Sequence, residues 1–249
     1  MDDFQLLIQF HINAERQGPG GERETLQAME LAGLDRSKKL KIADIGCGTG
    51  ASTLVLAENL NADITAIDLF PEFLEVLKSR LRKRELESQV TPRALSMEEL
   101  PFDPEELDVI WSEGAIYNMG FERGVQKWRP FLKKGGILAV SEITWLTAAR
   151  PPEIEEHWKR EYPEIARVSE KIKVLEDAGY KPLGYFPLPT SCWIANYYSP
   201  IEDRFESFLK GQNNSEQAIQ IVDGEKKEIE LYKKYHDHYS YGFYIGQKL

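Results

Sequence analysis

Apolar and polar residues alternate along this chain with two different periods. From residue 41 onward, short apolar runs of strand length are separated by segments with apolar side chains every three to four residues, the period of a helix. The expected strands are Lys41–Ile45, Asp63–Asp68, Val90–Ser96, Asp108–Ser112 and Ile137–Glu142. This repeated alternation predicts an α/β fold with a parallel sheet and crossover helices.

Three helices are expected between these strands, at Ser52–Leu60, Pro71–Glu87 and Glu122–Leu132. The second of them opens on a proline, which is favoured at the first position of a helix. Lys133–Gly136 holds two adjacent glycines and predicts a tight turn into the last of the five strands.

The N-terminal part of the chain precedes this alternation. Phe4–Glu15 has apolar side chains around more than one face, which indicates a helix packed on other parts of the protein. Arg16–Gly21 interrupts it, and Thr25–Leu34 is expected to form a second helix. These residues form either a lid over a ligand site or a packing arm with a flexible joint.

After Trp145 the pattern changes, because Arg150-Pro151-Pro152 starts an irregular connection. Helices are expected at Glu153–Arg160, Ser169–Ala178, Ile201–Leu209 and Ser215–His238, and strands at Tyr180–Leu188 and Tyr239–Lys248. No linker or repeat divides the chain, so we expect one domain over residues 1–249. It would comprise an N-terminal arm (1–36), a core (37–146) and a C-terminal cap (147–249).

Composition narrows the possible partners. The chain has 249 residues, a formal net charge of −10 and a sequence pI of about 5.1, which argue against a nucleic-acid backbone as the partner. Met1–Phe4 lacks the basic and apolar regions of a signal peptide, and no apolar run approaches the length of a membrane helix. Cys47 and Cys192 suit a reducing compartment, so we expect a cytoplasmic protein that does not bind membranes.

The most informative stretch is Lys41–Ala51, a strand followed by a glycine-rich turn and a helix. Glycines are needed where a turn is tight and a ligand approaches the backbone closely. The N-terminus of the following helix adds unpaired N–H groups and partial positive charge. The stretch therefore predicts a site for a nucleotide-type cofactor.

Two cofactors compete for this site. Gly46-x-Gly48-x-x-Ala51 fits the dinucleotide fingerprint, and Asp68 follows Gly46 by 22 residues, where a ribose ligand is expected. Asp44-x-Gly46-x-Gly48-x-Gly50 fits the loop of S-adenosylmethionine (SAM) enzymes at every position. A carboxylate at Asp44 suits a cationic methionine ammonium, reached directly or through water, whereas a pyrophosphate gains nothing from it.

The order of motifs over Lys41–Glu142 resembles the class I SAM-dependent methyltransferases, in particular the small-molecule group called methyltransferase type 11. The residues that carry the resemblance are I-A-D-I-G-C-G-T-G, Asp68, S-M-E-E-L-P-F at Ser96–Phe102, and L-D-V-I-W-S-E-G with L-K-K-G-G-I-L-A-V. The resemblance implies a Rossmann-like, mostly parallel sheet of seven strands with helices on both faces. The final reversed hairpin would come from Tyr180–Leu188 and Tyr239–Lys248.

The resemblance also implies roles for individual residues. Those expected around the methionine part of SAM are Asp44, Gly46, Cys47, Gly48 and Gly50. Asp68 would accept both ribose hydroxyls, or else cap the helix that Pro71 opens, and Leu69 would pack on the adenine. Ser96 and Met97 stand where relatives recognise the adenine edge, and Ser96 offers one weaker hydrogen bond there.

The acceptor side has weaker signals. Glu113 follows the fourth strand and is expected to touch cofactor, orient substrate or take a proton; His11 is the other candidate base, and Tyr117 and Asn118 are weaker candidates. Aromatic residues that could wall a substrate site follow the fifth strand: Trp145, Trp158, Trp193, Tyr197 and Tyr198. Each could equally pack the cap. His236-x-His238 has no further ligands nearby in sequence, so no metal site is expected.

Three functions follow in order. The first is a SAM-dependent methyltransferase that acts on a small molecule by in-line displacement. The second is an NAD-dependent oxidoreductase, disfavoured by Asp44 and by the length of chain before the glycine turn. The third is a SAM-binding regulator without catalysis. The acceptor atom, the base and the oligomeric state stay open at this stage.

Overall fold

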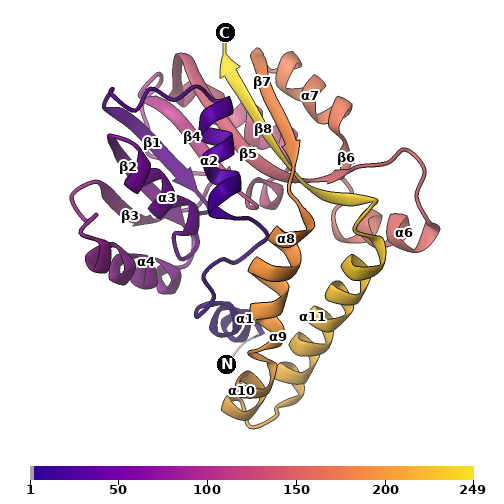
Figure 1. The fold of residues 1–249 in the computed structure, drawn as a ribbon. Helices are drawn as coiled ribbons and strands as arrows, with labels where there is room; N and C mark the ends of the chain where they lie inside the picture. The colour runs from indigo at the N-terminus through magenta and orange to yellow at the C-terminus, as the bar shows by residue number, and fades with distance from the viewer. Residues whose placement is uncertain (1–2) are drawn as a thin grey trace.

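A computed structural model describes residues 3–249, so residues 1 and 2 of the expected arm lie outside the described residues. One sheet organises the fold, with the strand order β3-β2-β1-β4-β5-β8-β7 (Figure 1). The strands are β1 (Leu40–Ile45), β2 (Ala62–Asp68), β3 (Val90–Ala94), β4 (Leu107–Glu113), β5 (Leu132–Trp145), β7 (Tyr180–Pro187) and β8 (Tyr239–Lys248). All neighbouring pairs are parallel except β5–β8 and β7–β8, which confirms the predicted sheet with its reversed final hairpin.

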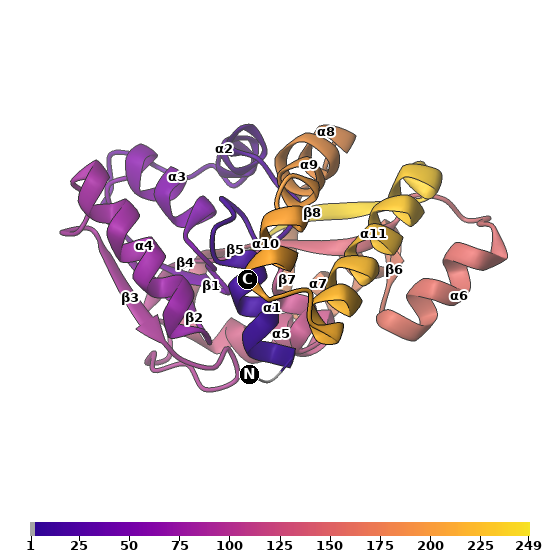
Figure 2. The ribbon, with the colours of Figure 1, turned by 90° about the horizontal axis from the view of Figure 1, so that it is seen from below.

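Alternating side chains of the strands supply two hydrophobic cores, one on each face of the sheet. On β1, Ile42 belongs to one core, and Ala43 and Ile45 belong to the other. The helices that line the sheet between strands are α3 (Ala51–Asn59), α4 (Pro71–Arg84), α5 (Phe121–Trp128) and α7 (Val168–Asp177). In Figure 2, α3 and α4 lie on one side of the sheet and α5 on the other. Burial on both faces explains why the strands have nearly continuous apolar sequences.

The strand order reverses between β1 and β4, because β2 and β3 lie on one side of β1 whereas β4 and β5 lie on the other. In open α/β sheets, ligands bind at the carboxyl ends of the strands at such a reversal. Gly46 directly follows β1, Asp68 ends β2 and Glu113 ends β4. The topology therefore brings these three sequence-predicted residues to one edge of the sheet.

Residues before β1 form the helices α1 (Asp3–His11) and α2 (Glu22–Leu31). The helix α2 packs beside the core, and α1 lies at the edge where the parallel strands end, against the long helix α11 (Glu216–Tyr235) (Figures 1 and 2). Ala14, Glu15 and Gln17 contact the glycine turn through hydrogen bonds that involve Thr49. This segment covers the carboxyl edge of the sheet.

Most of the remaining elements follow β5. In Figure 1, α6 (Pro152–Glu161) and the short β6 (Ala166–Arg167), which pairs with β5, lie at the right of the molecule. An extension projects below the sheet and comprises α8 (Thr190–Trp193), the π-helical turn η3 (Ile194–Tyr198), α9 (Ser199–Glu202), α10 (Phe205–Gly211) and α11. Two short 3-10 turns, η1 (Ile116–Asn118) and η2 (Arg129–Phe131), flank α5. Within residues 3–249, no helix has both the length and the apolar character needed to cross a bilayer.

Three expectations about elements were wrong in detail. The expected turn Lys133–Gly136 is an irregular part of β5, where the pairing with β4 jumps from Leu107–Leu132 to Val109–Ile137. The helix expected to reach Leu132 ends at Trp128, and Pro130 lies in the 3-10 turn that follows. The helical turns of Thr190–Tyr198 and the two-residue β6 were not predicted. Their segments are short and carry no clear period.

Candidate active site

The glycine turn after β1 has a backbone that only glycines adopt without strain. Gly46, Gly48 and Gly50 have φ values of 74°, 55° and 92°, in the left-handed region. A Cβ on Gly46 would overlap the Cβ of Ala115, and one on Gly48 would overlap the side-chain amide of Gln17. Ala115 and Gln17 fill the space beside these glycines, so no larger residue can stand there, and Gly46, Cys47 and Gly48 themselves line the cavity described below.

Asp44 is fully buried in β1, two residues before Gly46, and its Oδ2 accepts hydrogen bonds from Ser52 (2.9 Å) and Thr53 (2.6 Å) at the start of α3. Its Oδ1 has no hydrogen-bond partner among the described residues. Burial raises the pKa of this carboxyl to about 7, against the opposing effect of the two hydroxyls. An unsatisfied buried oxygen of this kind fits a cationic ligand group.

Asp68 connects the end of β2 to the glycine turn. Its Oδ2 accepts the N–H of Gly48 at 2.8 Å, and its Oδ1 accepts the N–H of Phe70 at 3.0 Å. Burial raises the pKa of Asp68, and the backbone N–H groups oppose that shift. Because each carboxylate oxygen can accept more than one hydrogen bond, Asp68 stabilises the turn before α4 and keeps acceptor capacity for two hydroxyls.

A cavity of about 550 Å³ lies beside these residues, within the size range of small-molecule sites. Its cofactor side contains these sequence-predicted residues: Gly46, Cys47, Gly48, Asp68, Leu69, Ser96 and Met97. Leu69 is 58% exposed and lies at the opening. Two predicted cofactor residues on this side, Asp44 and Gly50, do not line the cavity: Asp44 lies in β1, and Gly50 directly precedes α3.

Ser96 and Met97 are positioned by their own backbone contacts. Ser96 Oγ accepts the N–H of Glu98 at 3.2 Å, and the carbonyl of Met97 accepts Nε1 of Trp128 at 3.1 Å. Both residues line the cavity next to Leu95. They form a wall opposite Asp68 where a flat ring could lie, and their contact with adenine stays a prediction.

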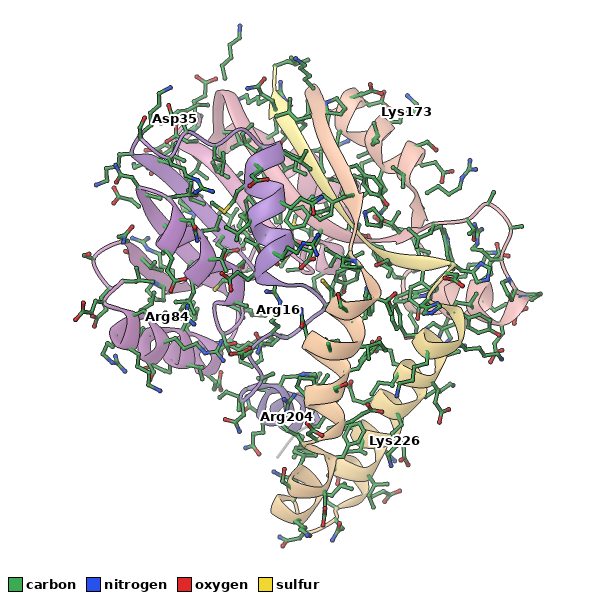
Figure 3. All side chains as sticks on the ribbon, viewed as in Figure 1. Arg16, Asp35, Arg84, Lys173, Arg204 and Lys226 are labelled. Carbon is green, nitrogen blue, oxygen red and sulfur yellow. The ribbon has the colours of Figure 1, made fainter. Side chains whose placement is uncertain are left out.

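Glu113 is held by the N-terminal arm, which sequence reasoning missed. Its Oε2 pairs with the Arg16 guanidinium, and its Oε1 accepts hydrogen bonds from Thr25 (2.7 Å) and Trp111 (3.0 Å). Arg16 and Glu113 are 12% and 8% exposed. Figure 3 shows Arg16 near the middle of the molecule, below the lower end of α2. With both oxygens engaged, Glu113 is better suited to anchor the arm than to take a proton.

Two more side chains tie the arm to the glycine turn. Gln17 Oε1 accepts the N–H of Thr49 at 2.9 Å. Arg80, from α4, donates to the carbonyls of Ala14 (2.9 Å) and Glu15 (3.0 Å) and to Thr49 Oγ1 (2.9 Å). The only sequence signal for these contacts was the Arg16-Gln17 pair before a glycine-proline break. Together they hold the arm over the cavity, in the position expected of a lid.

The far side of the cavity is lined by Leu7, His11, Tyr117, Asn118 and Tyr197. His11 Nε2 lies 3.5 Å from Glu225 Oε1, and His11 Nδ1 has no hydrogen-bond partner among the described residues. Burial raises the pKa of Tyr117 and, more strongly, that of Tyr197. These three sequence-predicted residues therefore meet in one place, although they come from α1, η1 and η3.

Two predicted substrate residues lie elsewhere. Trp145 is 5% exposed and stacks against the Arg150 guanidinium, and Trp193 is 2% exposed and stacks on Tyr232. Neither lines the cavity. The structure places both in the core that joins the sheet to the extension, so packing explains them and we leave them out of the proposed site. Within residues 3–249 no group of three His, Cys, Asp or Glu side chains is arranged to hold a metal ion.

The chain is similar to known methyltransferases in sequence and in fold. A family model described as a methyltransferase domain matches residues 42–136, which run from β1 into β5. Methyltransferase GfsG of Streptomyces halstedii is 32% identical over 124 residues, which are 49% of this chain and 44% of GfsG. The chain thus spans less than half of the length of that relative.

Two further similarities extend over most of the chain. Malonyl-[acyl-carrier protein] O-methyltransferase of Acetivibrio thermocellus is 26% identical over 225 residues, 83% of this chain and 76% of that protein. The solved structure of a SAM-dependent methyltransferase from Geobacter sulfurreducens, in complex with S-adenosylhomocysteine, has a TM-score of 0.86 at 14% identity. It covers 98% of both chains, so the arm and the extension share its fold as well as the core.

Proposed function

Because residues 42–136 belong to the class I SAM-dependent methyltransferases, we propose that this protein transfers the methyl group of SAM to a small-molecule acceptor. The observation that carries the proposal is the single cavity shared by the two halves of the site. Asp68 and the glycine turn line one side, and His11, Tyr117 and Tyr197 line the other. Cofactor and acceptor can therefore meet in one cavity.

The residues present fit SAM, the cofactor of this family. Gly46 and Gly48 line the cavity where the methionine part would lie, and the free Oδ1 of Asp44, two residues before Gly46, would supply negative charge near its ammonium. Asp68 offers two acceptors for the ribose hydroxyls, with Leu69, Ser96 and Met97 around the adenine. SAM supplies an activated methyl group on a sulfonium.

The protein's own residues would hold the two reactants in position and exclude water from the site. An in-line displacement needs its two reactants held close and aligned, and it gains when water is removed from the site. The arm provides this closure, since Arg16, Gln17 and Arg80 fasten it across the turn and the end of β4. The residues assigned to the arm (1–36), the cofactor core (37–146) and the acceptor-side cap (147–249) would then act on one cavity.

We assign the protein to a reducing compartment such as the cytoplasm. The support is chemical: Cys47 and Cys192 are both free and buried, and burial raises the pKa of each thiol. A methyl acceptor of small size fits a cavity of about 550 Å³. No nucleic acid is expected as a partner, given the net charge of −10.

The test is methyl transfer itself. Purified protein is incubated with SAM and pools of amines, phenols, carboxylates and thiols, and both S-adenosylhomocysteine and the methylated product are measured by mass spectrometry. Turnover in at least one pool, lost in Asp68→Ala, is the expected result. If S-adenosylhomocysteine binds to the protein but no pool is methylated, the protein would be a SAM-binding regulator and the proposal would be wrong.

A further inference from the structure

The acceptor end of the cavity has a chemical character of its own. Tyr197 enters it from the π-helical turn η3, and Tyr117 enters from the 3-10 turn η1. Asn196 Nδ2, beside Tyr197, donates to the carbonyl of Gly20 at 2.8 Å and so fixes η3 against the arm. Single π-helical turns often occur at functional sites. Two aromatic rings thus face one space from elements that are far apart in sequence.

Carboxylates stand behind these rings. Glu225 and Glu228 lie three residues apart on α11, on one side of the helix. Glu228 accepts the hydroxyl of Tyr198 at 2.9 Å, and Glu225 lies beside His11. The groups that act electrostatically on the Tyr197 hydroxyl are Glu228, Glu225, Tyr241 and Tyr117. Carboxylates and phenols therefore lie around this end, together with Arg204, whose charge acts on Tyr197 and Glu225. Here α11 runs alongside α1 and α10 (Figure 2).

Positive charge at the cavity is already paired. Among its lining residues the basic side chains are His11 and Arg16, and each lies against a carboxylate, that of Glu225 and that of Glu113. An acceptor with a carboxylate or phosphate would bring negative charge toward Glu225 and Glu228 and would find no unpaired cation among the lining residues. Arg204, whose Nε and Nη2 have no hydrogen-bond partner among the described residues, does not line the cavity. A cation would instead gain from the aromatic faces and the carboxylates behind them.

We propose that this end of the cavity is a subsite for a small organic cation, and that the methyl acceptor is its amine nitrogen. The inference rests on the proposed methyltransferase function and names its substrate class. The subsite comprises Tyr117, Tyr197 and His11, with Glu225 and Glu228 behind them.

A primary or secondary amine that enters as an ammonium ion has to lose one proton before it can attack. We assign this proton to His11, which lines the cavity and whose Nδ1 has no hydrogen-bond partner among the described residues. His11 Nε2 carries its own proton toward Glu225. The nitrogen lone pair then forms the N–C bond, while the C–S bond breaks and its electron pair stays on sulfur. A tertiary amine that enters as an ammonium ion loses its one proton in the same way.

The test compares choline with 3,3-dimethylbutan-1-ol, its neutral analogue of the same shape, by calorimetric titration into protein saturated with S-adenosylhomocysteine. We expect choline to bind about ten-fold more tightly than the neutral alcohol, as a cation in an aromatic, anionic site should. Tyr197→Leu and Glu228→Gln should each reduce that preference, whereas Tyr197→Phe keeps the ring and should preserve most of it. Equal binding of the two probes, or no binding of either, would overturn the proposal.

Two controls separate the possible failures. Titration of S-adenosylhomocysteine alone tests the proposed function, and it also reports whether each variant folds. If this ligand binds and choline has no preference, only the subsite is refuted. The substitutions could instead weaken the binding of SAM more than that of S-adenosylhomocysteine and leave the binding of choline unchanged. The tyrosines would then contact the sulfonium, and the amine subsite would likewise be refuted.

Discussion

The two ends of the cavity differ in whether backbone groups or side chains form them. The cofactor end is mainly backbone: three glycines with positive φ, and Asp68 accepting two N–H groups. The acceptor end is mainly side chains, contributed by α1, η1, η3 and α11. A backbone site fixes one cofactor shape and tolerates little change, whereas a side-chain site can change its specificity by single substitutions. Four variants test this difference.

Gly46→Ala should have the largest effect. Its φ of 74° strains any side chain, and the new Cβ would overlap Ala115 Cβ, which is buried and cannot rotate away. Left-handed strain costs of order 1–3 kcal/mol before the clash is counted. Titration with S-adenosylhomocysteine should show complete loss of binding. Gly211→Ala is the matched control, because no atom lies within 4 Å of its added Cβ and Gly211 does not line the cavity. Equal affinity of the two variants would contradict a backbone-built site.

Arg16→Met should have the next largest effect, because it leaves Glu113 without its charged partner in a largely buried place. Removing one member of such a pair costs about 3 kcal/mol. We expect lower stability in urea unfolding, weaker cofactor binding and faster proteolysis of residues 12–20.

Lys38→Met serves as the control for Arg16→Met, since Lys38 pairs with Asp35 at the surface, where both side chains are largely exposed. Such pairs are worth about 0–1 kcal/mol. A double-mutant cycle of Arg16→Met with Glu113→Gln should show coupling between the two sites. Additive effects would mean that Glu113 does not anchor the arm.

Glu228→Gln should change how stability depends on pH. Burial, followed by the charge of Glu225, raises the pKa of Glu228 to about 7 from 4.5. Between these values the folded state binds more protons than the unfolded state, so the free energy of unfolding falls as pH rises. Asp44, whose pKa is also about 7, contributes in the same direction.

Urea unfolding between about pH 5 and about pH 8 measures this slope. It should be shallower in Glu228→Gln than in the wild-type protein, and part of it should remain because of Asp44. Glu206→Gln is the control, because that side chain is 81% exposed. An unchanged slope in Glu228→Gln would show that Glu228 is not buried at the acceptor end.

Gly224→Ala should have the smallest effect, and a favourable one. Gly224 lies inside α11 with no atom within 4 Å of an added Cβ. Alanine in a helix interior is favoured over glycine by about 0.5–1 kcal/mol. Thermal unfolding should show a small rise in midpoint with unchanged cofactor binding. Destabilisation would mean that α11 needs flexibility at this point.

The difference between the two ends of the cavity also explains which parts of the site could be predicted from the sequence. The sheet was predicted correctly, and a methyltransferase-domain model matches residues 42–136, which contain the expected cofactor loop. Both could be predicted because Asp44–Gly50 is one continuous stretch and Asp68 ends the next strand. Each element of the cofactor end can be recognised in the sequence from its own hydrophobic period or glycine spacing.

The acceptor end gave no such signal. His11, Tyr117, Tyr197 and Glu228 come together only through the packing of helices that are distant in the chain. Trp145 and Trp193 looked equally suitable in sequence and are buried in the core, since aromatic residues serve both purposes. The Arg16–Glu113 pair joins residues 97 positions apart and has no sequence pattern.

The most direct test of the central claim is calorimetric titration with S-adenosylhomocysteine and, separately, with NADH, on wild-type protein and Asp68→Ala. We predict binding of S-adenosylhomocysteine with a Kd of about 1 μM, no binding of NADH, and an affinity in Asp68→Ala reduced by about ten-fold or more. Binding of NADH, with none of S-adenosylhomocysteine, would contradict the account.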